Sequence, residues 1–86
     1  MPRLSEFYGI VIYMYWADHE PAHFHAIYAG DEAQVLIENG AVLAGSLPRV
    51  AAKLVREWAR LHHAELLDDW RRAQAHEELV PIDGLR

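Results

Sequence analysis

The chain contains no cysteine, so neither disulfide bonds nor thiolate metal ligands are available to it. It also lacks an apolar run long enough to cross a bilayer. The longest such run, residues 7–17, is rich in tyrosine and falls short of the roughly 20 residues that a membrane helix needs. The opening segment MPRLSEF has no long apolar stretch of the kind found in a secretory signal peptide. We therefore expect a cytoplasmic protein with no membrane partner.

Basic residues are scarce and unevenly placed. Eight Lys and Arg stand against 13 Asp and Glu, which gives a net charge of −5. This balance disfavours general nucleic-acid binding through bulk electrostatics. Residues 1–46 contain a single basic residue, Arg3, and the others lie in residues 47–86. Any basic surface must therefore come from the second half of the chain.

The chain length and composition favour one small domain over residues 1–86. The 86 residues leave no room for a second domain, and 52% of them are hydrophobic, which is enough for a single core.

The first half of the chain has the pattern of an antiparallel sheet. The run FYGIVIYMYW predicts one long strand, central in the sheet and buried on both faces, in which Gly9 either weakens the strand slightly or marks a bulge. Asn39-Gly40 predicts a type I′ hairpin turn, and Gly30-Asp31 predicts another tight turn. Together these features predict four strands, over residues 7–16, 23–29, 32–38 and 41–45.

The second half changes to a helical period. Ser46 is a suitable N-cap residue, and an apolar stripe follows at Leu47, Val50, Ala51, Leu54, Trp58 and Leu61. The stripe then rotates and continues at Leu66, Leu67, Trp70 and Ala73. This shift indicates one of two arrangements. Either the helix kinks or splits near residues 62–64, so that both stripes serve one core, or one long helix presents a second apolar face. The expected fold is α+β, a four-stranded antiparallel sheet (β-β-β-β) covered by a C-terminal amphipathic helix.

The segment ADHEPAHFHA, residues 17–26, contains three of the six histidines. His23 and His25 alternate along an expected strand, so both point to the same face. His19 lies across the turn. Two or three imidazoles that converge in this way can bind a divalent metal. The expected ligands are His19, His23 and His25, with Asp18 as a further ligand or as the residue that orients them.

Two other interpretations of this segment remain open. Histidines titrate near neutral pH, so Asp18, His19, His23 and His25 could provide acid–base catalysis. The segment contains no obvious nucleophile, but an enzyme that cleaves RNA would use the ribose 2′-hydroxyl instead. Alternatively, the histidines bridge backbone groups at a structural corner or contact a partner protein.

Four basic residues recur at helical spacing on one face of the expected helix: Arg49, Lys53, Arg56 and Arg60. This basic stripe is either a solvated face or a binding surface for RNA phosphates or an acidic partner. Trp16 ends the first expected strand beside the histidines. It could form the wall of a binding pocket there, or close the sheet against the helix.

The stretch FYGIVIYMYWADHEPAHFHA resembles the hallmark of a family of small bacterial proteins known as a domain of unknown function. The family pattern runs approximately F-Y-G-I-x-I-x-M-Y-x-x-D-H-x-P-P-H-F-H-A. Ala22 departs from it, since a second proline is usual there. Further matches are Leu47-Pro48, Glu57-Trp58 and Glu65-Leu66-Leu67 with Trp70. The resemblance implies a two-gene module of the toxin–antitoxin type, and a site at Asp18, His19, Pro21, His23, Phe24 and His25.

Three functions follow as hypotheses, and the sequence leaves open whether the protein is an enzyme. The first is a toxin-side component of a toxin–antitoxin module that acts on RNA through the histidines. The second is a non-enzymatic module that binds a protein encoded by a neighbouring gene or a second copy of itself. The third is a small histidine-based metal-binding domain.

Overall fold

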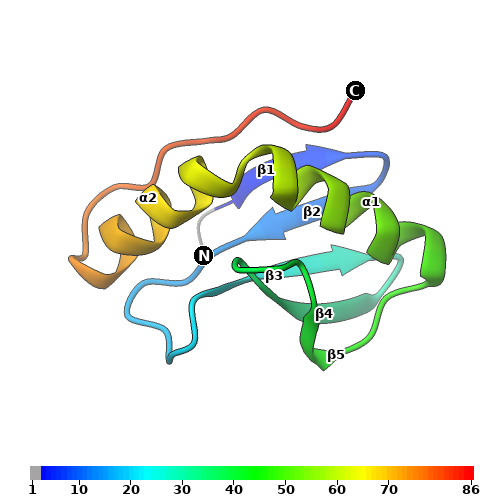
Figure 1. Cartoon of the computed structure of the whole chain (residues 1–86), viewed down its shortest axis with the longest axis horizontal. Helices are drawn as coiled ribbons and strands as arrows, with labels where there is room; N and C mark the ends of the chain where they lie inside the picture. The colour runs from blue at the N-terminus through cyan, green and yellow to red at the C-terminus, as the bar shows by residue number, and fades with distance from the viewer. Residues whose placement is uncertain (1–2) are drawn as a thin grey trace.

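A computed structural model describes residues 3–86 as a five-stranded antiparallel sheet with two helices over one face (Figure 1). The α+β class and the antiparallel sheet are confirmed, but the sheet has five strands and not the expected four. The strands follow chain order, so each pairs with the next along the sequence. They are β1 (Arg3–Phe7), β2 (Ile10–Tyr13), β3 (His23–Tyr28), β4 (Asp31–Leu36) and β5 (Val42–Gly45).

The extra strand is β1, which begins before the apolar run at residues 7–16 and pairs with β2 through a hairpin turn inside that run. Tyr8 and Gly9 both have positive φ, 49° and 78°, and Phe7 pairs directly with Ile10. Two successive positive φ angles define the type I′ turn, whose twist suits a two-residue hairpin. The expected single strand over residues 7–16 was therefore wrong. The centre of the sheet is β3, and β2 lies between β1 and β3.

The other two turns also differ from expectation. Ala29 and Gly30 have φ of 50° and 88° and join Tyr28 to its partner Asp31, so a type I′ turn lies here, one residue earlier than predicted. In the turn at residues 37–40 only Gly40 has a positive φ, and its N–H donates to the Leu36 carbonyl at 2.9 Å. The expected type I′ turn at Asn39-Gly40 was wrong, because this connection is longer than two residues.

The predicted split of the helix is confirmed. Helix α1 (Arg49–Leu61) and helix α2 (His63–Gln74) are separated at His62. The N-cap of α1 is Pro48, without a side-chain cap, so the expected cap at Ser46 was wrong. The Ser46 N–H instead donates to the Glu32 carbonyl, which keeps this residue beside the sheet.

The core lies between the helices and the sheet, around Trp58. This side chain is fully buried and packs against Phe7 and Phe24, with ring centroids 5.4 and 5.6 Å apart. The predicted stripe is correct in part. Ala51 and Trp58 are buried and Leu54 packs against the core, whereas Val50 and Leu61 are 71% and 56% exposed. The buried positions on the two helices are Ala51, Val55, Trp58 and Ala59 in α1, and Leu66, Asp69, Trp70 and Ala73 in α2.

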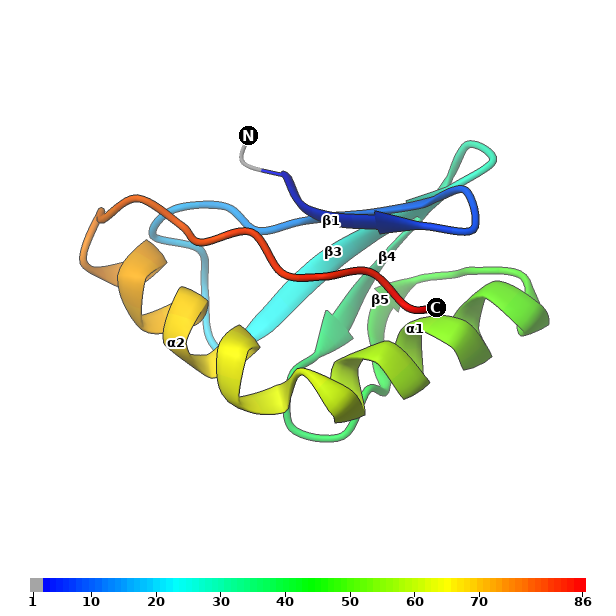
Figure 2. The ribbon, with the colours of Figure 1, turned by 90° about the horizontal axis from the view of Figure 1, so that it is seen from above.

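The segment after α2, residues 75–86, runs back along the molecule between the helices and β1 (Figure 2). The Ile82 N–H donates to the Leu4 carbonyl at 2.8 Å, and Trp58 Nε1 donates to the Asp83 carbonyl at 2.8 Å. Leu79 and Ile82 are buried. This segment therefore closes the core without forming a strand. Within residues 3–86, neither helix combines the length and the apolar character that crossing a bilayer requires.

Candidate metal centre

Strand β3 places two imidazoles on one face of the sheet. His23 and His25 alternate with Phe24, which points the other way into the core against Trp58. The ring centroids of His23 and His25 lie 5.2 Å apart. The expected shared face of the two histidines is therefore observed.

The connection between β2 and β3, residues 14–22, brings a carboxylate over these imidazoles. The C-terminal end of α2 and the segment after it hold this connection in place through three hydrogen bonds. The Ala17 N–H donates to the Ala73 carbonyl at 3.1 Å, and Gln74 Nε2 donates to the Asp18 carbonyl at 3.1 Å. Trp16 Nε1 donates to the Glu77 carbonyl at 2.9 Å. The position of Asp18 thus depends on the docking of α2.

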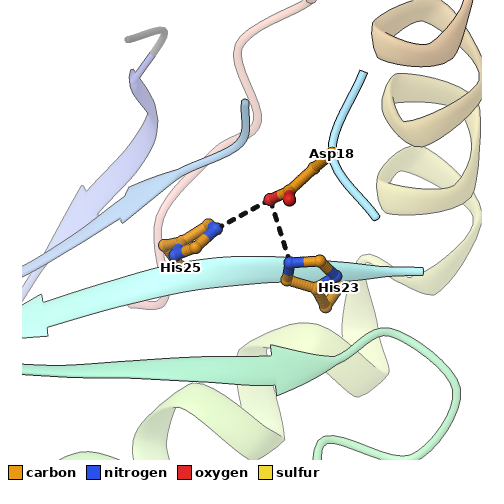
Figure 3. Close-up of side chains that lie close together, drawn as sticks. All are labelled: Asp18, His23 and His25. Carbon is orange, nitrogen blue, oxygen red and sulfur yellow. Dashed lines mark hydrogen bonds and ion pairs between the residues drawn. The ribbon is translucent and has the colours of Figure 1, made fainter. Parts of the chain in front are cut away.

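The two imidazoles converge on a single carboxylate oxygen of Asp18 (Figure 3). Nε2 of His23 and Nε2 of His25 each lie 3.0 Å from Oδ2 of Asp18. The other carboxylate oxygen, Oδ1, accepts the backbone N–H of His19 at 2.8 Å. One potential ligand atom from each of Asp18, His23 and His25 lies within 4.8 Å of the other two, which is compact enough for a shared metal ion.

The outer nitrogen of each imidazole faces another oxygen. Nδ1 of His23 lies 2.7 Å from the Pro21 carbonyl, and Nδ1 of His25 lies 3.3 Å from Oε2 of Glu32. Metal-binding histidines in proteins commonly donate this second N–H to a carbonyl or a carboxylate. Sequence reasoning missed both contacts, because they depend on the shape of the turn and on the register of β4 against β3.

The centre is largely withdrawn from solvent. The His23 side chain is fully buried, and the Asp18 side chain is 16% exposed. Burial by itself raises the pKa of Asp18. Hydrogen bonds from His25 and from the His19 backbone, together with the charges of His23 and His25, outweigh that effect and lower its pKa below the usual value. Burial raises the pKa of Tyr15, and the nearby Glu32 and Asp18 carboxylates raise it further. The Tyr15 ring packs edge-on against the His25 ring, with centroids 4.3 Å apart.

Comparison with protein-family models matches residues 9–71 to a domain of unknown function (DUF4160). The chain belongs to this family. Comparison of this DUF4160 chain with curated proteins and with solved structures gave no significant match. The bacterial origin and the toxin–antitoxin association that the sequence resemblance implies stay predictions.

The DUF4160 match contains the complete centre. It covers β2 to β5, the connection at residues 14–22, helix α1 and most of α2. Strand β1 and the segment at residues 75–86 lie outside it. Asp18, His23 and His25 therefore lie in the matched part of this chain. The residues that anchor the connection, Ala73, Gln74 and Glu77, lie beyond it.

His19 lies beside the centre and does not take part in the convergence. Its side chain is 60% exposed, and its Nδ1 contacts the Glu20 carbonyl at 3.0 Å. Its Nε2 is 3.8 Å from Oδ1 of Asp18, on the side away from the shared oxygen. The ring stacks on His23 with centroids 4.7 Å apart. The structure thus brings together Asp18, His23 and His25, and not the three histidines proposed as ligands from the sequence.

The remaining predicted binding residues lie elsewhere. Trp16 is 44% exposed, and its indole N–H is bonded to the segment after α2. The basic stripe is exposed along α1, and two of its members line a cavity at the junction of the helices. The stripe consists of Arg49, Lys53, Arg56 and Arg60.

Proposed function

We propose that this DUF4160 domain binds a divalent transition-metal ion through Nε2 of His23, Nε2 of His25 and the carboxylate of Asp18. The proposal rests on one observation. Both Nε2 atoms approach the same carboxylate oxygen at 3.0 Å, while both Nδ1 atoms are turned away toward other oxygens.

The protonation of His23 provides the first argument. The Pro21 carbonyl can only accept a hydrogen bond, so Nδ1 of His23 carries a proton. In the neutral ring, Nε2 then presents a lone pair toward Oδ2 of Asp18, which is also an acceptor. Nε2 is buried and lacks a hydrogen-bond partner of normal geometry among residues 3–86. Two acceptors at this separation require a positive charge, either a second proton on the ring or a metal ion.

The surroundings of His25 favour the metal ion. Its Nδ1 lies 3.3 Å from Oε2 of Glu32, and its Nε2 lies 3.0 Å from Oδ2 of Asp18. A divalent ion bound by the two Nε2 atoms would leave Nδ1–H of each ring to donate to its oxygen acceptor, the Pro21 carbonyl for His23 and Glu32 for His25. This arrangement is typical of metal-binding histidines.

The dimensions and the donor types also fit a metal. Zinc binds histidine nitrogen and carboxylate oxygen at about 2.0–2.2 Å, so neighbouring tetrahedral ligands lie about 3.3 Å apart. The two contacts of 3.0 Å with Oδ2 of Asp18 are close to that value, and all three candidate ligand atoms lie within 4.8 Å of one another. Imidazole and carboxylate donors suit zinc, iron, nickel and copper, and three protein ligands leave a further position for water or another ligand.

The toxin hypothesis receives less support from this geometry. Catalysis on RNA requires imidazoles that a phosphodiester can reach, and His23 is fully buried while His25 is 5% exposed. The proposed action on RNA and the partner from a neighbouring gene stay predictions, and binding to a neighbouring gene product tests the latter.

Calorimetric titration of zinc into tag-free protein that has been treated with a chelator tests the proposal. We expect one zinc ion per chain and a release of protons that grows as the pH falls, since zinc displaces them from the imidazoles. Asp18→Asn and His25→Ala should each weaken zinc binding by more than about 100-fold, because the first removes the negative charge of a direct ligand and the second removes an imidazole ligand.

His19→Ala is the matched control, because this histidine is adjacent to the centre and lies outside it. It should bind zinc as tightly as the unmodified protein. Circular dichroism would confirm that each variant is folded, and Asp18→Asn keeps the side-chain shape. Folded protein that binds no zinc, or an equal loss in the His19→Ala and His25→Ala variants, would overturn the proposal.

A further inference from the structure

A cavity of about 490 Å³ lies between the turn after β4 and the junction of the two helices. It contains none of the proposed metal ligands. Its size is within the usual range for sites that bind small molecules. The residues that line it are Ile37, Glu38, Asn39, Gly40, Arg56, Arg60 and His63.

Two arginines of the cavity have no charged partner. Arg3, Arg71 and Arg72 each form an ion pair with an acid three residues away. Arg56 and Arg60 form no ion pair among residues 3–86, although both line the same cavity. A pair of free guanidinium groups one helical turn apart is suited to a doubly charged anion, because each presents a planar fork of N–H donors.

The turn after β4 packs against the base of one of these arginine side chains. Gly40 packs so closely that an added Cβ would lie 2.8 Å from Cγ of Arg56, and its φ is 74°. The turn thus lies against the aliphatic part of the arginine side chain. A side chain restrained in this way loses less conformational entropy when its guanidinium binds a ligand.

A second cavity of about 340 Å³ adjoins the first and shares Ile37, Glu38 and His63 with it. It adds apolar surface from Leu36 and Leu67, so it can accommodate the uncharged part of a ligand. Glu38 lines both cavities and can accept hydrogen bonds from hydroxyl or amino groups of a ligand. The arginines of the first cavity therefore provide cationic groups for an anion, and the second cavity provides space for an organic group that carries hydrogen-bond donors.

We propose that this cavity binds a small organic phosphate, with the phosphomonoester held by Arg56, Arg60 and His63. A phosphomonoester carries a charge of about −1.5 to −2 at neutral pH, which exceeds that of a carboxylate and matches two arginines. A long polyanion fits less well, because the chain has a net charge of −5 and the arginines open into a bounded cavity.

Nuclear magnetic resonance titration of isotope-labelled protein with adenosine 5′-monophosphate tests the proposal. Shifts should concentrate on the amides of Asn39, Gly40 and Arg60. Inorganic phosphate should shift the same amides with lower affinity, and adenosine should not bind detectably. Arg60→Gln should weaken nucleotide binding about tenfold, because it removes a charge-assisted contact.

Lys53→Gln is the matched control. Lys53 belongs to the same basic stripe, and its side chain does not line the cavity. This variant should bind the nucleotide as tightly as the unmodified protein. The proposal is wrong if neither phosphate compound shifts these amides at millimolar concentration. It is also wrong if a short RNA binds more tightly than the nucleotide and loses affinity equally in the Lys53→Gln and Arg60→Gln variants, which would make the stripe a nucleic-acid surface.

Discussion

The two oxygens of the Asp18 carboxylate have different partners. Oδ1 accepts the backbone N–H of His19, and Oδ2 faces His23 and His25. Burial opposes the charged form of the carboxylate, but these contacts lower its pKa below the usual value. The folded protein therefore favours the ionised carboxylate more strongly than the unfolded chain does, and this difference appears as pH-dependent stability.

We predict that Asp18→Asn lowers stability at neutral pH and has little effect in acid. A lowered folded-state pKa contributes stability that is complete above the unfolded pKa and is lost as the pH falls through the folded pKa. In chelator-treated protein, the loss at neutral pH should be about 1–3 kcal/mol, since a charged hydrogen-bond acceptor is removed. Urea unfolding at a series of pH values measures it.

Asp31→Asn serves as the control, because this carboxylate is exposed and lies outside the centre. It should be as stable as the unmodified protein throughout the series. If Asp18→Asn lowered the free energy of unfolding as much at pH 3 as at pH 7, the ionisation of Asp18 would not be the source of the lost stability.

The sequence predicted part of the centre. Strand alternation placed His23 and His25 on one face, because that property depends only on local backbone geometry. The direction of His19 depends on the connection at residues 14–22, where Ala17 has a positive φ of 54° that no sequence pattern indicated. The contact with Glu32 depends on the register of β4, which the turn at residues 29–30 sets.

At the scale of elements, the two-residue turns determine how many strands form. Ala29 and Gly30 both occupy the left-handed region. We predict that Gly30→Ala lowers the free energy of unfolding by about 1–2 kcal/mol, the cost of left-handed backbone for a residue with a Cβ. An added Cβ meets no atom within 4 Å there, so the cost is conformational and not steric.

Ala29→Asn tests the same turn in the opposite direction, because asparagine is favoured in type I′ turns. It should raise the free energy of unfolding. Urea unfolding of both variants measures the effects. Equal stability of the unmodified protein and the Gly30→Ala variant would contradict the assignment of the turn.

The elements that were predicted wrongly share one physical cause. The turn at Tyr8-Gly9 lies inside a run of apolar and aromatic residues, so neither composition nor alternation indicated a break there. The division of the helix was predictable, because the buried face rotates between Trp58 and Leu66 and a straight helix cannot bury both stripes. Turns depend on the φ angles of one or two residues, whereas a helix depends on a pattern repeated over many.

Asp69 joins α2 to the segment that follows it. Its side chain is 1% exposed, and its Oδ1 accepts hydrogen bonds from Arg72 Nη1 and from the Val80 backbone N–H, both at 2.9 Å. We predict that Asp69→Ala lowers the free energy of unfolding by about 2–3 kcal/mol, because it removes both bonds and leaves a backbone donor without its acceptor. Asp68→Ala is the control and should change stability little, since its ion pair with Arg71 is exposed.

Urea unfolding, monitored by the fluorescence of the buried Trp58 and Trp70, measures the stability of the Asp68→Ala and Asp69→Ala variants. Equal losses in the Asp68→Ala and Asp69→Ala variants would contradict the role given to Asp69.

Across the whole molecule, the candidate metal centre joins parts that are distant in sequence. Its imidazoles come from the central strand β3, and Asp18 comes from a connection bound to the end of α2. The ring of His23 also packs against Trp70 of α2, with centroids 5.4 Å apart. An ion at the centre would hold the sheet and α2 together, and the unfolded chain has no arrangement that places these ligands at one point.

Zinc should therefore stabilise the whole fold. A ligand that binds only the folded state adds about 2.7 kcal/mol at a concentration 100 times its dissociation constant. For a domain of this size, that corresponds to a rise in melting temperature of about 10–20 °C. Thermal unfolding with zinc, with magnesium and with excess chelator measures the effect. Magnesium should have little effect, because it prefers oxygen ligands to imidazole.

The same measurement on variants decides whether the centre is the cause of that stabilisation. His19→Ala should show the full rise with zinc, and Asp18→Asn should show almost none. A rise of equal size in the Asp18→Asn variant would mean that zinc binds elsewhere, for example at the exposed His62–Glu65 pair, whose Nδ1 and Oε1 atoms lie 2.6 Å apart. His62→Ala would then abolish the rise, whereas it should leave the rise intact if Asp18, His23 and His25 hold the ion.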